Sequence, residues 1–169
     1  MQVLGIAGYK NSGKTTLLTR LVRELRARGL RVSTVKHVHH AIDLDRPGKD
    51  TFAHREAGAV EVVMLSDARW AILHERPGDT DMLAELRDIV SRLSPVDLVL
   101  VEGLKTLPMQ RIEIRAPEAS DPLPDDGDTI ALASDGPAHP RLPTFRRDDV
   151  SALADFVGTL VSEGRLQWS

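Results

Sequence analysis

The sequence predicts an α/β fold in which a mainly parallel sheet is flanked by helices. Short apolar runs typical of buried strands alternate along the chain with segments of helical periodicity. The run "VDLVLVEG" at residues 96–103 holds four consecutive aliphatic residues, which indicates a strand covered on both faces. Because parallel neighbours need crossover connections, usually helices, this alternation favours a parallel sheet. No internal repeat divides the 169 residues, and we expect a single domain over 1–169.

The first half of the chain opens with an apolar run at residues 3–7, which predicts a buried strand. Apolar residues then recur at helical spacing from Leu17 to Leu25, and Gly29 is a natural end for this helix. The other patterns of this half predict strands at 31–36, 60–65 and 70–73 and a short helix at 49–57.

The second half begins with a helix whose apolar face lies within 82–93 and whose N-cap is Asp79 or Thr80. Farther on, the segment 116–128 is rich in proline and aspartate, and we expect an exposed loop there. The remaining patterns predict strands at 111–115 and 129–133 and a last amphipathic helix at 150–161.

The composition is that of a globular protein, with 41% hydrophobic and 28% charged residues. The net charge of −3 argues against a general binder of nucleic acid or of anionic membranes. The chain has no cysteine, which excludes disulfides and thiolate metal sites and favours a cytoplasmic location. We also see no features of a signal peptide and no apolar run long enough to cross a membrane.

Residues 8–15, "GYKNSGKT", fit the phosphate-loop pattern G-x-x-x-x-G-K-[ST] between a predicted strand and a predicted helix. In such a loop, converging backbone N–H groups and the positive end of the helix dipole hold phosphate. Lys14 can reach the β- and γ-phosphates, and the Thr15 hydroxyl is placed to bind Mg²⁺. The predicted fold is therefore like that of P-loop NTPases, with these phosphate-binding candidates: Gly8, Asn11, Ser12, Gly13, Lys14, Thr15 and Thr16.

A phosphate loop of this kind needs an acidic partner for the metal, which we expect at the end of a neighbouring buried strand. Glu102 ends the strand in "VDLVLVEG", where it could bind Mg²⁺ through water or orient an attacking water. Asp97 starts the same strand, about 15 Å away at the rise of a β-strand, and is predicted to be a cap or turn residue.

The stretch "KHVHHAIDLDRPGKDTFAHR" at residues 36–55 allows three interpretations. Lys36, His37 and Asp50 could contact the phosphates or a second anionic ligand, because parallel strands share the edge at which they end. Alternatively, His37, His39 and His40 could bind a transition metal, since imidazole suits zinc or nickel. The third possibility is a solvated polar loop.

The strand in "TIALASD" ends at Asp135, which could recognise a purine base. A carboxylate accepts two N–H donors from the N1/N2 edge of guanine and discriminates against adenine, which lacks that donor pair. The alternative is an ordinary turn aspartate, which is common after a strand.

Together these segments resemble the molybdopterin-guanine dinucleotide biosynthesis protein B (MobB) family. The resemblance extends from the first strand to Asp135. The phosphate loop alone is shared by many proteins, so the more specific part is the combination of "KHVHH" and "GKDTFAHREAGA" with "VEGLK". The other matching segments are "GIAGYKNSGKTTLL", "RIEIR" and "ALASD".

The resemblance implies a homodimeric P-loop adaptor that binds GTP with Mg²⁺ and has at most a weak GTPase activity. Its partner would be the guanylyltransferase of molybdenum-cofactor biosynthesis, with molybdopterin itself as a further candidate. Carried over by position, Lys14 and Glu102 become the catalytic candidates and Thr15 and Glu102 the metal ligands. Asp135 becomes the candidate for guanine recognition.

Two other functions remain open from the residues themselves. One is a metallochaperone-type GTPase that uses the cluster His37, His39 and His40, although the absence of cysteine weakens it. The other is a P-loop small-molecule kinase, which needs an acceptor pocket and a closing lid. The acidic segment 116–128 would make a poor lid over phosphates.

Overall fold

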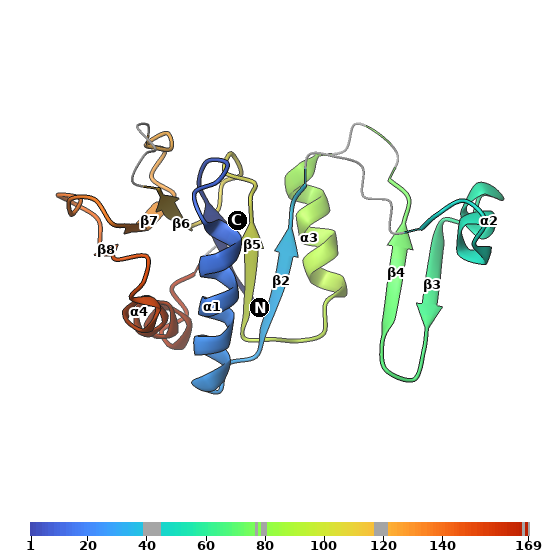
Figure 1. The fold of residues 1–169 in the computed structure, drawn as a ribbon, viewed down its shortest axis with the longest axis horizontal. Coiled ribbons are helices and arrows are strands. Elements are labelled where there is room, and N and C mark those ends of the chain that lie inside the picture. The colour runs from blue at the N-terminus through green and yellow to red at the C-terminus, as the bar shows by residue number, and fades with distance from the viewer. Residues whose placement is uncertain (39–44, 77, 79–80, 117–121, 167, 169) are drawn as a thin grey trace. The chain divides into compact units, whose positions relative to one another are not determined.

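The computed structural model describes residues 1–38, 45–76, 78, 81–116, 122–166 and 168 (Figure 1). The chain forms two compact units. We call Met1–His37 together with Arg87–Ser169 the sheet unit, and Val38–Leu86 the hairpin unit. The single domain expected over 1–169 stays a prediction.

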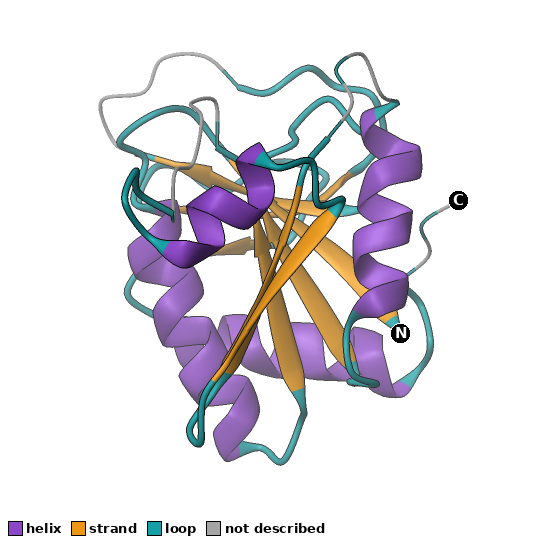
Figure 2. Ribbon diagram, turned by 90° about the vertical axis from the view of Figure 1, so that its right-hand side faces the viewer, coloured by secondary structure: helices purple, strands orange, loops and turns teal. Residues whose placement is uncertain are grey.

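The sheet unit contains a six-stranded sheet in the order β2–β5–β1–β6–β7–β8, and every neighbouring pair is parallel. The twist of the sheet is visible as the fan of orange strands in Figure 2. This confirms the predicted α/β fold with a parallel sheet. Its strands are β1 (Gln2–Ala7), β2 (Val32–Lys36), β5 (Leu98–Glu102), β6 (Arg111–Arg115), β7 (Thr129–Ser134) and β8 (Thr144–Phe145).

Helices α1 (Lys14–Ala27) and α4 (Val150–Ser162) bury their apolar stripes together with one face of this sheet. Leu17, Leu21 and Leu25 of α1 share a core cluster with Leu153 and Val157 of α4. Alternate strand residues complete the cluster, among them Leu4, Ile6, Leu98, Leu100, Ile112 and Ile114. The burial follows from the two periodicities, since helical spacing and strand alternation each place their apolar residues on one side.

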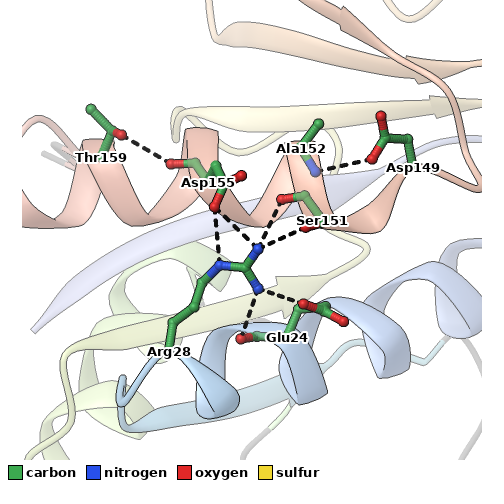
Figure 3. A network of polar contacts seen from close by, with 7 residues as sticks. All are labelled: Glu24, Arg28, Asp149, Ser151, Ala152, Asp155 and Thr159. Carbon is green, nitrogen blue, oxygen red and sulfur yellow. Dashed lines mark hydrogen bonds and ion pairs between the residues drawn. The ribbon is translucent and has the colours of Figure 1, made fainter.

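A polar bridge reinforces the contact between these two helices (Figure 3). Arg28, just after α1, donates to the Asp155 carboxylate at 3.1 Å and to the Ser151 hydroxyl at 3.0 Å, both on α4. The same guanidinium pairs with Glu24 one turn back on α1. The chain then turns at Gly29, where φ is 86° and Leu30 N donates to Leu25 O, so Gly29 ends the helix as predicted.

The other face of β6 carries charges that the sequence pattern did not place inside the protein. Arg111 is 1% exposed and Glu113 is 2% exposed. Arg111 pairs with Asp126 and Asp128, and a carboxylate oxygen of Glu113 accepts the N–H of Leu123 at 2.9 Å. The expectation of an exposed loop over 116–128 is therefore wrong in part. Leu123 is buried because the described end of this segment covers the charged face of β6.

Smaller differences concern ends of elements. Helix α3 (Met82–Arg92) is preceded by Asp81, whose carboxylate accepts the N–H of Leu83 at 3.0 Å. The caps predicted at Asp79 and Thr80 lie outside the described residues. The two-residue strand β8 was not predicted, because two residues are too short to show any alternation.

The hairpin unit contains α2 (Asp50–Glu56) and an antiparallel pair of strands, β3 (Glu61–Leu65) and β4 (Trp70–His74). Residues opposite each other in the register share a face, and one face pairs Val63 with Ile72 and Leu65 with Trp70. These four large apolar side chains are between 42% and 82% exposed. The hairpin thus presents an uncovered apolar face, whereas Val62 on the opposite face is buried.

Among the described residues, no helix combines the length and the apolar character that crossing a membrane requires.

Candidate nucleotide-binding site

The segment between β1 and α1 forms a loop whose backbone requires glycine at both ends. Gly8 has a φ of 152°, and a Cβ there would lie 2.4 Å from the carbonyl oxygen of Ile114. Gly13 has a φ of 86° and precedes α1 without a side-chain cap. Only glycine adopts such positive φ values readily, so these two residues let the loop close tightly in front of the helix.

The loop and the start of α1 have hydrogen-bond donors that are available to a ligand. The first N–H groups of α1 have no partner within the helix, and its first turn holds no acidic residue that would offset the helix dipole. Ser12 is 1% exposed, and its hydroxyl has no hydrogen-bond partner among the described residues. The predicted phosphate contacts stay a prediction, but their residues form one continuous loop and helical turn: Gly8, Asn11, Ser12, Gly13, Lys14, Thr15 and Thr16.

Lys14 folds back across the loop, where its Nζ donates to the carbonyl oxygen of Tyr9 at 2.6 Å. Partial burial lowers the pKa of Lys14 below its ordinary value. The negative charge of Glu102 opposes this lowering of the pKa, and the positive charges of Lys105 and Lys36 add to it. Several cations therefore act on one another at the mouth of the loop.

Glu102 lies beside the phosphate loop because its strand, β5, pairs with both β1 and β2. The register sets Glu102 level with Ile6 of β1 and with Lys36 of β2. The Thr15 hydroxyl donates to a carboxylate oxygen of Glu102 at 2.7 Å, and Lys36 Nζ lies 3.4 Å from the same oxygen. The structure thus brings together the two predicted metal ligands and one predicted phosphate contact, with Glu102 only 8% exposed.

Asp97, at the opposite end of β5, is a turn residue, as predicted. Its carboxylate accepts the backbone N–H of Arg31 at 2.7 Å and pairs with the Arg31 guanidinium at 3.4 Å. These hydrogen bonds hold the pKa of Asp97 below its ordinary value, and the bond from the backbone N–H of Arg31 contributes most.

A cavity of about 320 Å³ opens beside the phosphate loop. Its size suits a small ligand. Ser12, Gly13 and Thr16 form one wall, and Asp135 lies just beyond β7. The remaining lining residues are Leu17, Arg20, Arg146, Arg147 and Asp148.

The Asp135 carboxylate in this cavity is already paired. One oxygen accepts the backbone N–H of Arg147 at 3.1 Å, and the other accepts Nε of the same residue at 2.6 Å. The Arg147 side chain also reaches the carbonyl oxygen of Ser12 at 3.4 Å. The hydrogen bonds from Arg147 hold the pKa of Asp135 below its ordinary value, and the bond from the Arg147 side chain contributes most. Guanine recognition by Asp135 stays a prediction, and it would require an exchange of partners.

The other candidates from the histidine stretch are His37, His39, His40 and Asp50. The backbone N–H of His37 donates to Glu102 O at 3.0 Å, which fixes the chain just after β2. Asp50 begins α2 in the hairpin unit, and its predicted phosphate contact stays a prediction. His39 and His40 lie outside the described residues. In the part of the chain that the structure describes, no three His, Asp or Glu side chains are grouped so that they could hold a metal ion.

Two residues of the same stretch have a structural role inside the hairpin unit. Asp45 is 4% exposed, and its carboxylate accepts the hydroxyl of Thr51 at 2.6 Å. Arg55 lies 3.8 Å from Asp45 and pairs with Glu75 at 3.1 Å, which ties α2 to the residue after β4. Part of the charge that indicated a ligand site therefore serves to hold this unit together.

Sequence reasoning missed Arg147, the residue that links the cavity to the phosphate loop. It lies 135 positions from Ser12, in a charged run "RRDD" that is typical of a solvated segment. The one available signal was its place directly before the last helix, since loops that follow parallel strands gather at the ligand edge of the sheet.

Comparisons with known proteins identify the family of this chain. The family described as "Molybdopterin guanine dinucleotide synthesis protein B" (MobB) matches residues 3–135. Two relatives are named molybdopterin-guanine dinucleotide biosynthesis adapter protein. That of Haemophilus influenzae is 40% identical over 158 residues, which cover 92% of this chain and 86% of the relative. That of Escherichia coli is 39% identical over 160 residues, which cover 92% and 90%.

Solved structures agree with the family match. A crystal structure described as molybdopterin-guanine biosynthesis protein B superposes with a TM-score of 0.75 at 32% identity, over 95% of this chain and 99% of the other. A MobB homologue from Bacillus stearothermophilus has a TM-score of 0.68 at 26% identity, over 96% and 99%. The extent of the family match and the identity to these relatives show that the chain belongs to the MobB family.

Proposed function

We propose that this chain binds GTP with Mg²⁺ and acts as an adapter in the synthesis of molybdopterin guanine dinucleotide. The observation that carries the proposal is the meeting of Lys14, Thr15 and Glu102 at the carboxyl ends of β1 and β5. A donor-lined loop with a lysine and a hydroxyl–carboxylate pair at its mouth is suited to a metal-bound triphosphate. The names of the curated relatives supply the pathway.

The oxygen atoms at the loop fit Mg²⁺. The Thr15 hydroxyl and the Glu102 carboxylate are hard ligands 2.7 Å apart, and magnesium is usually bound through one or two carboxylates together with phosphate oxygens. When bound, the ion would neutralise negative charge on the phosphates. Lys14 and Glu102 are also the proposed catalytic residues of a weak GTPase activity. Lys14 would place its charge beside the phosphates, and Glu102 would orient water.

Guanine would occupy the cavity beside Asp135. The cavity shares Ser12, Gly13 and Thr16 with the phosphate loop, so a ligand there would be continuous with bound phosphates. Asp135 would accept the N1 and N2 donors of guanine in exchange for donors of Arg147. Adenine has no such donor pair and could not replace the lost hydrogen bonds.

The partners follow from the adapter role. We propose the molybdenum-cofactor guanylyltransferase as the protein partner, molybdopterin as a second ligand, and a cytoplasmic location. We also propose a homodimer, which the hairpin unit supports. A two-stranded sheet is marginally stable by itself, and covering Val63, Leu65, Trp70 and Ile72 would remove a large apolar face from water.

Calorimetric titration of the unmodified protein with GTP and ATP, in Mg²⁺, tests the nucleotide assignment. We expect GTP to bind at least about tenfold more tightly than ATP, and Asp135→Ala to reduce that ratio toward one. Equal affinities in the unmodified protein would refute guanine recognition by Asp135. Repeating the titration with the guanylyltransferase present tests the adapter role, which predicts a ternary complex.

The homodimer is tested by the molar mass in solution. Leu65→Glu places a charge in the apolar face of the hairpin, and we expect it to convert a dimer to a monomer. Ile89→Glu on α3 is the matched control, since it adds the same charge at another exposed apolar residue. A monomeric unmodified protein at micromolar concentration would contradict the dimer.

A further inference from the structure

The turn that follows β5 has two consecutive residues with positive φ, and the sequence does not indicate this conformation for the second of them. Gly103 has a φ of 98°, and the next residue, Leu104, has a φ of 53°. The left-handed region is uncommon for residues other than glycine. The turn is anchored on both sides, because Gly103 N donates to Ile6 O at 3.1 Å and Leu107 N donates to Leu104 O at 3.1 Å. It connects the acidic residue of the site, Glu102, to Lys105.

This turn carries Lys105 back over the phosphate loop. The Lys105 ammonium lies 4.3 Å from the centre of the Tyr9 ring, and Tyr9 is the second residue of the loop motif. Within the described part of the chain, Lys105 forms no hydrogen bond and no ion pair, so the ring is its recorded contact. A cation held on an exposed aromatic face is bound weakly. It can therefore leave the ring and contact an anion instead.

The charges of Lys14 and of the three charged side chains that act on it do not cancel. Lys14, Lys36 and Lys105 contribute +3 and Glu102 contributes −1, which leaves +2. Lys105 and Lys36 both act to lower the pKa of Lys14, so the three ammonium groups lie within electrostatic reach of one another. Such a convergence of like charges opposes folding, and it is typical of a site for a multiply charged anion.

We propose that Lys105 is a third phosphate-binding lysine, which leaves the Tyr9 ring to contact the terminal phosphate of a nucleoside triphosphate. The inference rests on the proposed function for the identity of the ligand. Lys14 donates to the backbone carbonyl oxygen of Tyr9, whereas Lys105 lies over the ring of the same residue. A flexible four-carbon stem lets Lys105 move without rearranging the turn. A diphosphate would leave this lysine on the ring, so Lys105 would distinguish GTP from GDP.

The test compares triphosphate with diphosphate affinity in Lys105→Ala. By calorimetry in Mg²⁺ and at fixed salt, we expect the variant to lose about tenfold or more in GTP affinity, because a charge-assisted contact is removed. The GDP affinity should change less than about twofold, since only screened long-range charge is lost. Lys105→Arg should retain most of the GTP affinity. An equal loss for GTP and GDP, or no loss for either, would overturn the proposal.

Arg26→Ala is the matched control. It removes one positive charge from the same unit at the far end of α1, about 18 Å from Lys14 at the rise of a helix. We expect neither nucleotide affinity to change, and a loss of GTP affinity equal to that of Lys105→Ala would contradict a local contact.

Titration with ATP and ADP separates this proposal from the guanine assignment. If ATP binds as tightly as GTP, yet Lys105→Ala still weakens both triphosphates selectively, Lys105 contacts the terminal phosphate and the guanine assignment fails. If GTP is preferred but Lys105→Ala leaves the ratio of GTP to GDP affinity unchanged, the guanine assignment stands and the role of Lys105 fails.

Discussion

The two sides of the candidate nucleotide site differ in how their charges are balanced. On the phosphate side, the three lysines Lys14, Lys36 and Lys105 outnumber the one carboxylate, Glu102, and leave an excess of positive charge. On the base side, Arg147 pairs with Asp135 at 2.6 Å and Arg146 pairs with Asp148 at 3.1 Å, so these four charges cancel and Arg20 alone adds a positive charge to the lining of the cavity.

This difference separates affinity from selectivity. An excess of positive charge attracts any polyphosphate, whatever its base. A paired carboxylate yields its partner only to a ligand that replaces the lost hydrogen bonds, which makes the exchange at Asp135 selective but weak. The phosphate side should therefore determine how tightly nucleotides bind, and the base side which nucleotide binds.

The largest effect is expected from Lys14→Ala, which removes the lysine of the phosphate loop. GTP and ATP affinity should both fall by about 100-fold or more, because the variant loses a charge-assisted contact inside a partly buried loop. Calorimetry with both nucleotides measures this loss. Arg23→Ala, exposed on α1, serves as the control for charge. A selective loss of GTP binding alone would break the comparison, since it would give the phosphate side a role in base choice.

Glu102→Gln should change how binding depends on magnesium. The amide keeps the shape of the side chain but removes the negative charge, so we expect GTP affinity in Mg²⁺ to fall about tenfold. Without Mg²⁺, the affinity should stay equal or rise, because no carboxylate then repels the phosphates. Titrations with Mg²⁺ and with a chelator measure both values. The same magnesium dependence in the variant and the unmodified protein would argue against Glu102 as a metal ligand.

Arg147→Ala sharpens the comparison on the base side. If Arg147 competes with guanine for Asp135, its removal should raise GTP affinity about threefold, as expected for one exposed ion pair, and leave ATP affinity unchanged. Competition binding of the two nucleotides gives the ratio. A loss of GTP preference as large as that of Asp135→Ala would instead show that Arg147 holds the carboxylate in its recognition geometry.

The smallest effect concerns stability and pH. The Arg147 hydrogen bonds depress the pKa of Asp135 in the folded protein, so their stabilising contribution is complete above the unfolded value of about 4. It is lost as the pH falls through the lower, folded pKa. Asp135→Asn should therefore lower Tm at pH 7 and make progressively less difference as the pH falls below the unfolded pKa of about 4.

Thermal melts across this pH range measure the effect, with Asp67→Asn in the exposed hairpin turn as the control. A difference in Tm between Asp135→Asn and the unmodified protein that is independent of pH would mean that the charge of Asp135 does not contribute. On the phosphate side, Lys14→Ala should not lower Tm in this way, because partial burial disfavours the charge of that lysine and lowers its pKa.

The parts of the fold that could be predicted are those encoded by neighbouring residues. Four consecutive aliphatic residues marked β5, which is buried throughout, and helical spacing marked α1 and α4. The phosphate loop was predictable because its glycines, lysine and threonine are adjacent in sequence. Glu102 followed from topology, since parallel strands end at one edge and β5 pairs directly with β1.

The parts that could not be predicted depend on contacts between distant residues or on unusual backbone. Arg111 and Glu113 have the alternation of an exposed strand face, yet both are buried, and the distant Leu123 donates its N–H to Glu113. Arg147 donates to the carbonyl oxygen of Ser12, which lies 135 positions earlier in the sequence. Lys105 is three residues from Glu102, but its direction depends on a positive φ at Leu104, which leucine does not indicate.

The position of Tyr9 gives the protein a built-in spectroscopic probe. It is the only tyrosine of the 169 residues, so selective isotope labelling of tyrosine would yield ring resonances from one place in the molecule. That ring carries Lys105, its backbone carbonyl accepts Lys14, and its hydroxyl donates to Pro122 O at 3.5 Å. A single pair of signals would therefore follow the phosphate loop, the turn after β5 and the segment that covers β6 in one titration.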